Sequence, residues 1–314
     1  MNRNLIDFYK EKTLVRASYL PSFIFWSVGQ TPGGLDKLRK LFSLALFNRF
    51  GQSGIDADRR LMLSRYPYSW ARYAADGARM QFFDAQNRVI RKIALQQNDG
   101  QIEREFRLRS LMGDACPPVL AWDSQEGAIV ERWLNIKRRG SDKAALSQAI
   151  TLLKDKLYRC HSVDAEQYVS QFGDVIDQKK VRTFLTRYEV GRLEISDVHG
   201  DLWQGNLLYD RRGELVIVDW EYGRSCVVSH DIWTYLFQAQ KAASKPFDAR
   251  FFEKFAEAVS SLLDVRCDIE TARAHHVIHL IERFSFFLSL NLPHKNEEIE
   301  YLRNEIGDML EPNE

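Results

Sequence analysis

The amino-acid sequence predicts a two-lobed α+β fold, with a small antiparallel sheet and one helix followed by a larger, mainly helical lobe. Three observations support this prediction. Short segments rich in β-branched residues lie between residues 65 and 132. Apolar residues recur at helical spacing over most of the chain beyond residue 133, and a length of 314 residues favours two lobes. The expected boundaries are 1–57 for an N-terminal helical extension, 58–132 for the first lobe and 133–314 for the second.

The composition argues against two classes of function. Forty-four Lys and Arg balance forty-three Asp and Glu, and the net charge of +1 is too small for the basic surface of a nucleic-acid-binding protein. No segment approaches the about 20 apolar residues that cross a bilayer, and the first residues lack the layout of a secretory signal. The 4 cysteines form no CxxC pair. We therefore expect a cytoplasmic protein with reduced thiols and no nucleic-acid partner.

The N-terminal extension is expected to be helical because apolar residues recur at helical spacing from Leu38 to Ala45, after a breaker at residues 31–34. Lys37 and Lys40 make the same segment basic. A basic amphipathic helix can lie on a membrane surface as a peripheral contact, or it can cap a neighbouring domain. Both interpretations stay open.

The first lobe is expected to contain a β-hairpin, one helix and two further strands. The hairpin is indicated by β-branched and aromatic residues on either side of a turn at 84–87. The helix is indicated by apolar residues at i, i+3, i+4 spacing, ending before Pro117. The predicted strands are 78–83, 89–95, 119–122 and 128–131, and the predicted helix is 102–112.

The second lobe is expected to be mainly helical. Its first helix carries an apolar stripe from Leu146 to Leu157 and ends near His161, and a second helix spans 178–190. Two short apolar segments, 193–198 and 215–218, are predicted as buried strands, and long helices return from 231 to 310.

The clearest chemical signature lies between the two predicted strands of this lobe. The segment 199–206 reads HGDLWQGN, and Asp219 opens a DWE motif thirteen residues after Asn206. Phosphoryl transfer needs a carboxylate beside the attacking hydroxyl, and hard oxygen ligands that hold Mg²⁺ on the phosphates. Asp201 can supply the first, while Asn206 and Asp219 can supply the second.

This HGD loop with its asparagine and the DWE strand end resemble those of the aminoglycoside phosphotransferase and choline kinase superfamily, which has a protein-kinase-like fold. The resemblance implies that Asp201 is the catalytic base and that His199 orders the loop from behind. It also implies that Asn206 and Asp219 bind magnesium and that ATP is the phosphate donor. It extends from about residue 65 to about residue 290.

Upstream, the resemblance implies a lysine on the third strand and a glutamate on the following helix. Lys92 and Glu105 fit this order, with Lys92 on the α- and β-phosphates and Glu105 holding its ammonium group. Arg91 and Glu103 are the alternatives, although strand alternation directs Arg91 and Lys92 to opposite faces. Backbone groups of residues 131–133, from Glu131 to Trp133, are expected to meet the adenine edge.

Other residues have two interpretations each. Asp231 resembles the acidic residue that anchors the loop, but a helix N-cap fits equally well. His275 and His279 are four residues apart, a spacing that can chelate zinc or simply face the acceptor site. Four aromatic side chains could form a wall for a substrate ammonium group or belong to the core: these are Trp203, Trp220, Tyr222 and Trp233.

The sequence departs from the protein-kinase pattern in its nucleotide loop. Between residues 65 and 78 the only glycine is Gly77, so no GxGxxG loop is present. The phosphate-gripping residues are therefore expected near Asp76 and Gly77 in a shorter turn. This difference favours a small-molecule kinase over a protein kinase.

The expected function is ATP- and magnesium-dependent transfer of the γ-phosphate to a hydroxyl of a small molecule or glycoconjugate. The acceptor we favour is a sugar of a lipopolysaccharide-type envelope saccharide, because the basic N-terminal extension suits work at a membrane face. Choline, ethanolamine or an aminoglycoside are the alternative acceptors. A non-catalytic nucleotide-binding scaffold is the alternative from another functional class.

Overall fold

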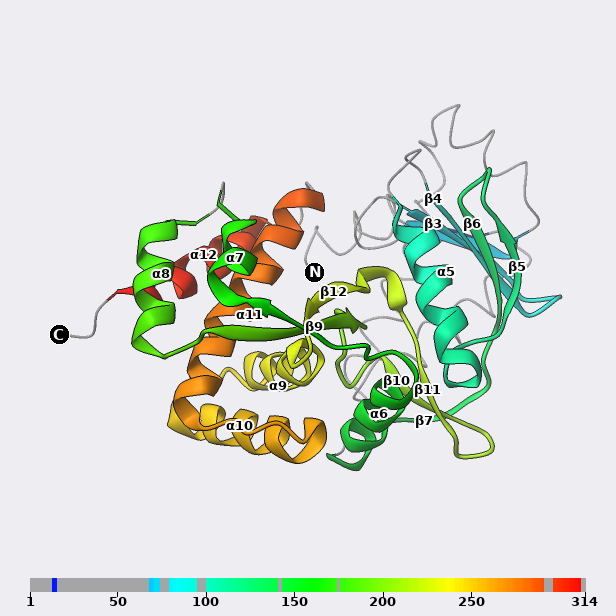
Figure 1. Ribbon diagram of the computed structural model, residues 1–314. Helices are drawn as coiled ribbons and strands as arrows, with labels where there is room; N and C mark the ends of the chain where they lie inside the picture. The colour runs from blue at the N-terminus through cyan, green and yellow to red at the C-terminus, as the bar shows by residue number, and fades with distance from the viewer. Residues whose placement is uncertain are drawn as a thin grey trace. The chain divides into compact units, whose positions relative to one another are not determined.

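The computed structural model describes residues 13–15, 68–73, 79–94, 100–140, 143–173, 176–290 and 296–311, and Figure 1 shows the helices and strands that they form. The chain divides into two compact units. Unit 1 comprises residues 1–103 and 118–133, and unit 2 comprises residues 104–117 and 134–314. Most of the helix predicted at 102–112 therefore groups with unit 2, whereas the sequence analysis assigned it to the first lobe.

Unit 1 contains a six-stranded antiparallel sheet with the strand order β1-β2-β3-β4-β6-β5. Its strands are β1 (Thr13–Val15), β2 (Trp70–Tyr73), β3 (Arg79–Asp84), β4 (Val89–Ala94), β5 (Val119–Asp123) and β6 (Ala128–Arg132). The four strands that the sequence predicted are confirmed as β3, β4, β5 and β6. Their apolar side chains form the core of the unit, with Met80, Phe82, Ile93 and Ile129 buried.

Side-chain hydrogen bonds at two turns explain where these strands end. The carboxylate of Asp84 accepts hydrogen bonds from the backbone N–H groups of Gln86 and Asn87, each 3.0 Å long. Asp123 does the same for the backbone of Gln125 and Glu126 in the next turn. Asp favours turns because its side chain can bind its own backbone two residues onward. The turn predicted at 84–87 is thereby confirmed.

Unit 2 contains two three-stranded antiparallel sheets, ordered β11-β10-β7 and β12-β9-β8. Their strands are β7 (Ile136–Arg139), β8 (His161–Asp164), β9 (Arg192–Val198), β10 (Leu207–Asp210), β11 (Leu215–Ile217) and β12 (Arg224–Val227). The sequence predicted β9 and β11 but not the other four. β7 and β8 are largely exposed, so they lack the alternating apolar pattern that would have revealed them.

The helices of unit 2 confirm the expected helical character of this part of the chain. They are α5 (Gln101–Met112), α6 (Lys143–Lys156), α7 (Ala165–Ser170), α8 (Gln178–Arg187), α9 (His230–Ala242), α10 (Ala249–Leu263), α11 (Ile269–Leu290) and α12 (Asn296–Leu310). Four of these helices follow an aspartate that accepts a backbone N–H of the first turn, namely Asp164, Asp177, Asp248 and Asp268. Figure 1 shows the long helix α11 between α12 and α10, and it packs against both.

The core of unit 2 is rich in aromatic side chains from α9, α10 and α11. Trp233, Phe237, Phe255 and Phe284 are each at most 2% exposed. Each such side chain stabilises the fold by roughly 1.5–3 kcal/mol through burial of apolar surface. This packing holds α11 in a fixed position relative to the strands that carry the motif residues.

Two predictions concern residues that the structure mostly does not describe. Within 1–57 only Thr13–Val15 is described, and it is a strand, β1, so the expectation of a helix is wrong for these three residues. The helical segment expected near Leu38 and the phosphate-gripping residues Asp76 and Gly77 lie outside the described residues. Among the helices that are described, none is long and apolar enough to cross a membrane.

Candidate active site

The motif residues lie on the loop between β9 and β10 and immediately after β11. β10 and β11 pair antiparallel, with Leu207 opposite Ile217. The next residues along this register also meet, because the N–H of Val218 donates to the carbonyl of Asn206 at 3.0 Å. Strand pairing therefore places Asn206 opposite the residue that precedes Asp219, although Asn206 and Asp219 are thirteen positions apart in the sequence.

His199 connects the loop to the end of β11. Its ring is fully buried, and the N–H of Asp201 donates to its Nδ1 at 3.3 Å while its Nε2 lies 2.9 Å from the carbonyl oxygen of Val218. A backbone N–H can only donate, so the proton of the neutral ring is on Nε2, which donates to Val218. His199 thus joins the backbone of Asp201 to the residue that precedes Asp219.

Asp231, in the first turn of α9, anchors the same loop. Its carboxylate accepts the backbone N–H groups of His199 and Gly200, each at 2.9 Å, and the hydroxyl of Tyr158 at 3.1 Å. Burial and the neighbouring Asp231 raise the pKa of Tyr158 well above its ordinary value, so this hydroxyl stays a donor. Ser229 occupies the N-cap position of α9. Of the two interpretations of Asp231, the structure therefore favours the loop anchor.

Two residues near the motif adopt backbone conformations with positive φ. Gly200 has φ +80°, and a Cβ at this position would overlap the carbonyl oxygen of Tyr222, so the close approach requires glycine. Asp219 has φ 65° and ψ 58°, the left-handed region. This conformation costs a non-glycine residue roughly 1–3 kcal/mol, a cost that is typical of functional sites.

The side chains of Asn206 and Asp219 suit a magnesium ion chemically. The amide nitrogen of Asn206 donates to the carbonyl of Asp201 at 2.9 Å, which leaves the amide oxygen as the atom available to a cation. Asp219 is half-buried and adds a carboxylate. An amide oxygen and a carboxylate are the hard oxygen donors that Mg²⁺ prefers.

An arginine that no sequence motif indicated lies beside Asp201. The Nη1 of Arg283, on α11, is 3.7 Å from Oδ1 of Asp201. Glu298, on α12, accepts hydrogen bonds from Nε and Nη2 of Arg283 at 3.1 and 2.9 Å. No local signal could have identified this contact, because residues 201 and 283 meet only through the packing of α11.

In unit 1, Lys92 and Glu131 lie on neighbouring strands. Both are buried, and Nζ of Lys92 is 3.7 Å from Oε2 of Glu131. Trp133 donates its backbone N–H to the carbonyl of Arg88 at 2.8 Å. Arg91, the alternative to Lys92, is half-buried. Only backbone contacts were predicted for Glu131, so the sequence did not indicate its ion pair with Lys92.

Glu105 is buried in α5, within unit 2. Its Oε1 accepts a hydrogen bond from Nη1 of Arg109, one turn onward, at 3.1 Å. Arg109 also donates to the carbonyl of Pro117. The pairing of Lys92 with Glu105 stays a prediction, as do the nucleotide-binding roles of Glu131 and Trp133.

The four aromatic residues around the motifs do not form one wall. Trp220, Tyr222 and Trp233 are buried in the core of unit 2, whereas Trp203 is 36% exposed. A Cβ at Gly205 would overlap the ring of Trp203, so the indole lies directly over the loop backbone. Of the two interpretations, core packing is therefore correct for three of these residues.

Comparisons with known proteins agree with this arrangement. Residues 55–266 match the model of the phosphotransferase enzyme family. Among solved structures, the fold is similar to that of a choline kinase from Streptococcus pneumoniae, with a TM-score of 0.52 and 13% identity over 74% of this chain and 89% of that chain.

A choline/ethanolamine kinase family protein from Mesorhizobium loti has a TM-score of 0.50 and 14% identity over 75% of this chain and 86% of that chain. No curated protein sequence matches the chain. Identities this low show a shared fold, and the predicted two-lobed, kinase-like α+β class is confirmed.

Proposed function

We propose that this chain, which belongs to the phosphotransferase enzyme family, is a small-molecule kinase that transfers the γ-phosphate of ATP to a hydroxyl group. The observation that carries the proposal is that hydrogen bonds connect the loop 199–206 to the end of β11. Asp201, Asn206 and Asp219 are linked through the Asn206–Asp201 hydrogen bond and the buried ring of His199. Magnesium, held by Asn206 and Asp219, would neutralise charge on the phosphates.

The proposed role of Asp201 is to orient the acceptor and remove its proton. The hydroxyl oxygen attacks the γ-phosphorus, the bond from that phosphorus to the bridging oxygen of ADP breaks, and the hydroxyl proton passes to the carboxylate of Asp201. Arg283 places a positive charge beside this carboxylate, with its Nη1 3.7 Å from Oδ1 of Asp201. Most of the rate enhancement in this reaction class comes from positioning and electrostatics.

In unit 1, Lys92 is proposed to bind the α- and β-phosphates, with Glu105 as the partner that holds its ammonium group. Glu131 and Trp133 are proposed to meet the adenine through their backbone. The supporting observation is that the side chain of Lys92 is buried in the sheet and forms an ion pair with Glu131. A lysine held in this way loses little freedom when it binds a phosphate, which is the value of pre-positioned charge.

For the acceptor we propose a saccharide hydroxyl ahead of choline, ethanolamine or an aminoglycoside. Three of the four aromatic residues considered for an ammonium-binding wall are buried in the core, which weakens the case for a quaternary ammonium acceptor. The exposed indole of Trp203 lies on the catalytic loop itself, where an apolar sugar face could rest. The basic N-terminal segment keeps an envelope saccharide as the first candidate.

The test is ADP release by the full chain with ATP and Mg²⁺ in the presence of a panel of acceptors. The panel contains lipopolysaccharide-core sugars, choline, ethanolamine and aminoglycosides. We expect saccharides to stimulate ADP release and choline to have no effect. If only choline stimulates ADP release, choline replaces a saccharide as the proposed acceptor. If the chain binds nucleotide but releases no ADP under any condition, the non-catalytic scaffold is favoured.

A further inference from the structure

Arg224, the first residue of β12, connects the two segments that carry the proposed catalytic groups. Its Nη1 donates to the carbonyl of Tyr222 at 3.0 Å and to the carbonyl of Gly200 at 3.4 Å. Gly200 precedes Asp201, and Tyr222 follows Asp219 by three residues. The two carbonyl oxygens carry partial negative charge and would repel each other, so the guanidinium between them favours their close approach.

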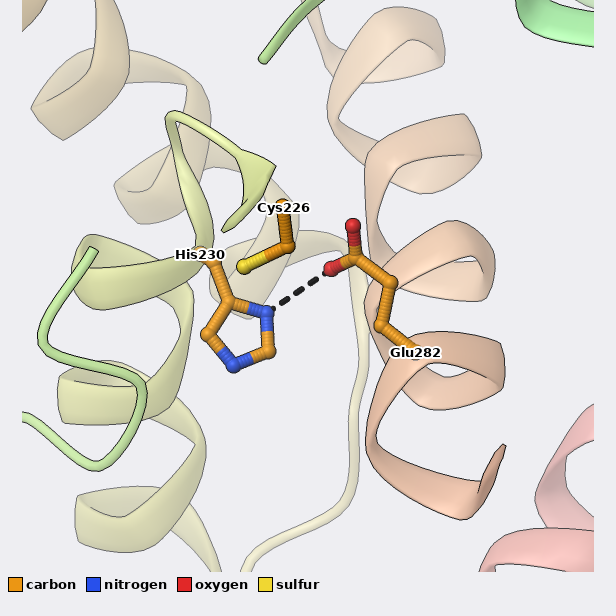
Figure 2. A group of neighbouring side chains, drawn as sticks. All are labelled: Cys226, His230 and Glu282. Carbon is orange, nitrogen blue, oxygen red and sulfur yellow. Dashed lines mark hydrogen bonds and ion pairs between the residues drawn. The ribbon is translucent and has the colours of Figure 1, made fainter. Parts of the chain in front are cut away.

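The guanidinium of Arg224 is itself held from two sides. It lies over the ring of Phe286, 4.4 Å from the ring centroid, and its Nη2 is 3.0 Å from Nε2 of His230. Arginine can only donate, so Nε2 of His230 accepts and the proton of the neutral ring is on Nδ1. That nitrogen is 2.8 Å from Oε2 of Glu282, a contact that Figure 2 marks with a dashed line.

Glu282, on α11, is the last acceptor in the series of hydrogen bonds that runs from Arg224 through His230. It is 3% exposed, and it also accepts from the hydroxyl of Tyr168 at 2.6 Å, from the N–H of Val227 at 2.9 Å and from Nδ1 of His279 at 2.8 Å. Burial by itself raises the pKa of Glu282, but the hydrogen bonds from His230 and His279 hold it well below its ordinary value. Glu282 is therefore an ionised acceptor.

The same residues could be mistaken for a metal site. Potential ligand atoms of Cys226, His230 and Glu282 lie within 4.8 Å of one another (Figure 2). A metal bound to Nδ1 of His230 would displace its proton while Nε2 still accepts from Arg224, which requires an imidazolate. Burial also raises the pKa of the Cys226 thiol well above its ordinary value, which disfavours the thiolate that binds metals. The hydrogen-bonded arrangement is chemically complete without a cation.

We propose that Arg224 is a positioning residue for phosphoryl transfer, acting through the carbonyls of Gly200 and Tyr222 to set the spacing of Asp201 and Asp219. His230 and Glu282 act behind it by fixing the direction of its guanidinium. The proposal rests on the proposed function of Asp201 and Asp219. A misplacement of about 1 Å at a reacting centre can cost roughly 10²-fold in rate, so a clamp between these two segments affects catalysis without touching substrate.

The test compares two variants of the full chain, using readouts that do not need the acceptor. Arg224→Met removes the donors but keeps the stem over Phe286, and Arg273→Met is the matched control. The guanidinium of Arg273 likewise lies over a ring, that of Phe252, 5.0 Å from its centroid. The readouts are hydrogen exchange of the backbone N–H groups in residues 199–206 and 219–223, and the hydrolysis of Mg-ATP by water.

For Arg224→Met we expect exchange in both segments to become about tenfold faster or more, because charge-assisted hydrogen bonds stabilise them. We expect ATP hydrolysis to fall roughly 10²-fold, and Arg273→Met to leave both readouts unchanged. Unchanged exchange in Arg224→Met would overturn the proposal. If the parent chain releases no ADP from Mg-ATP, either with water or with the acceptor panel, the proposed function fails, but the exchange data still decide whether Arg224 positions the two segments.

Two further measurements, on a second variant and on the metal content, also test the proposal. If circular dichroism shows that Arg224→Met does not fold, hydrogen exchange is measured on Glu282→Gln instead. This substitution weakens the hydrogen bond between Glu282 and His230 and leaves Arg224 in place. We expect faster exchange in the same two segments, and no change would overturn the proposal. Metal analysis of the purified parent chain is expected to find less than one equivalent of zinc. One equivalent that is lost in His230→Gln would overturn the hydrogen-bonded chain.

Discussion

The residues assigned to phosphate chemistry are held in different ways in the two units. In unit 1, Lys92 lies on β4, which is hydrogen-bonded to β3 on one side and to β6 on the other. In unit 2, Asp201 lies on a loop whose backbone is held by side-chain hydrogen bonds, above all from Asp231 in α9 and from His199 in the loop itself. A strand residue is positioned by the sheet ladder, whereas a loop residue depends on individual anchors.

The comparison predicts that single substitutions on the loop change catalysis without disturbing the fold, while substitutions on the strand affect both. Substitutions of Asp201, Asp219 and Lys92 test this difference.

Asp201→Asn should lower kcat by about 10²-fold or more, because the amide cannot accept the hydroxyl proton. Nucleotide affinity and thermal stability should stay close to those of the parent chain. Turnover and calorimetric ATP binding measure the two effects. Asp197→Asn is the matched control, since this carboxylate of β9 pairs with Arg107 at the surface. Near-normal turnover of Asp201→Asn would remove this residue from its proposed role.

Asp219→Ala should abolish the magnesium dependence of nucleotide binding, because it removes the carboxylate among the proposed ligands. The binding of ATP is measured by titration with and without Mg²⁺. An affinity that still rises with magnesium as in the parent chain would count against Asp219 as a ligand. Residue 219 has a positive φ, which alanine adopts less readily than asparagine does. Asp219→Asn is therefore a second variant that disturbs the backbone less.

Lys92→Met should weaken ATP binding by roughly tenfold or more, because a charge-assisted hydrogen bond to phosphate is lost. The substitution also leaves Glu131 without this ion pair in a buried position, so the melting temperature should fall, unlike that of Asp201→Asn. Arg91→Met is the matched control on the opposite face of β4. If Arg91→Met lost more ATP affinity than Lys92→Met, Arg91 and not Lys92 would be the phosphate-binding residue.

A smaller effect is expected from pH, through the buried histidines of unit 2. Burial, followed by the charge of Arg224, lowers the pKa of His230 to about 3, and burial with the neighbouring His279 lowers that of His276 to about 3. Their contribution to stability is complete above pH 6.5, the ordinary histidine value. It is lost as the pH falls towards 3, because the unfolded chain takes up protons that the folded chain does not.

Each of these histidines should lower the free energy of unfolding by about 1.4 kcal/mol per pH unit below 6.5. Urea denaturation at several pH values measures the slope. His276→Asn, which keeps an acceptor for the indole N–H of Trp233, should reduce the slope by about one proton. His161→Gln, at an exposed position, should leave it unchanged. A slope that is the same in all three proteins would contradict the prediction.

The accuracy of the sequence predictions follows the range of the interactions involved. The hairpin at 84–87 and the helices α8 and α10 were predictable because turn chemistry and apolar spacing are local properties of the chain. The loop 199–206 and Asp219 were identifiable because the residues that carry the chemistry lie close together in sequence. In unit 2 the strands β7, β8, β10 and β12 were missed; β7 and β8 are largely exposed, so they carry no apolar pattern to recognise.

The sequence by itself therefore determined the two-lobed fold class, the family and the candidate catalytic segment. Only the tertiary structure decided which distant residues support that segment. Arg283 reaches Asp201 because α11 packs in one position, and Arg224 reaches Gly200 because β12 pairs with β9. The physical reason is that periodicity and turn chemistry act over a few residues, whereas these contacts join residues more than twenty positions apart and exist only after the helices and strands have packed.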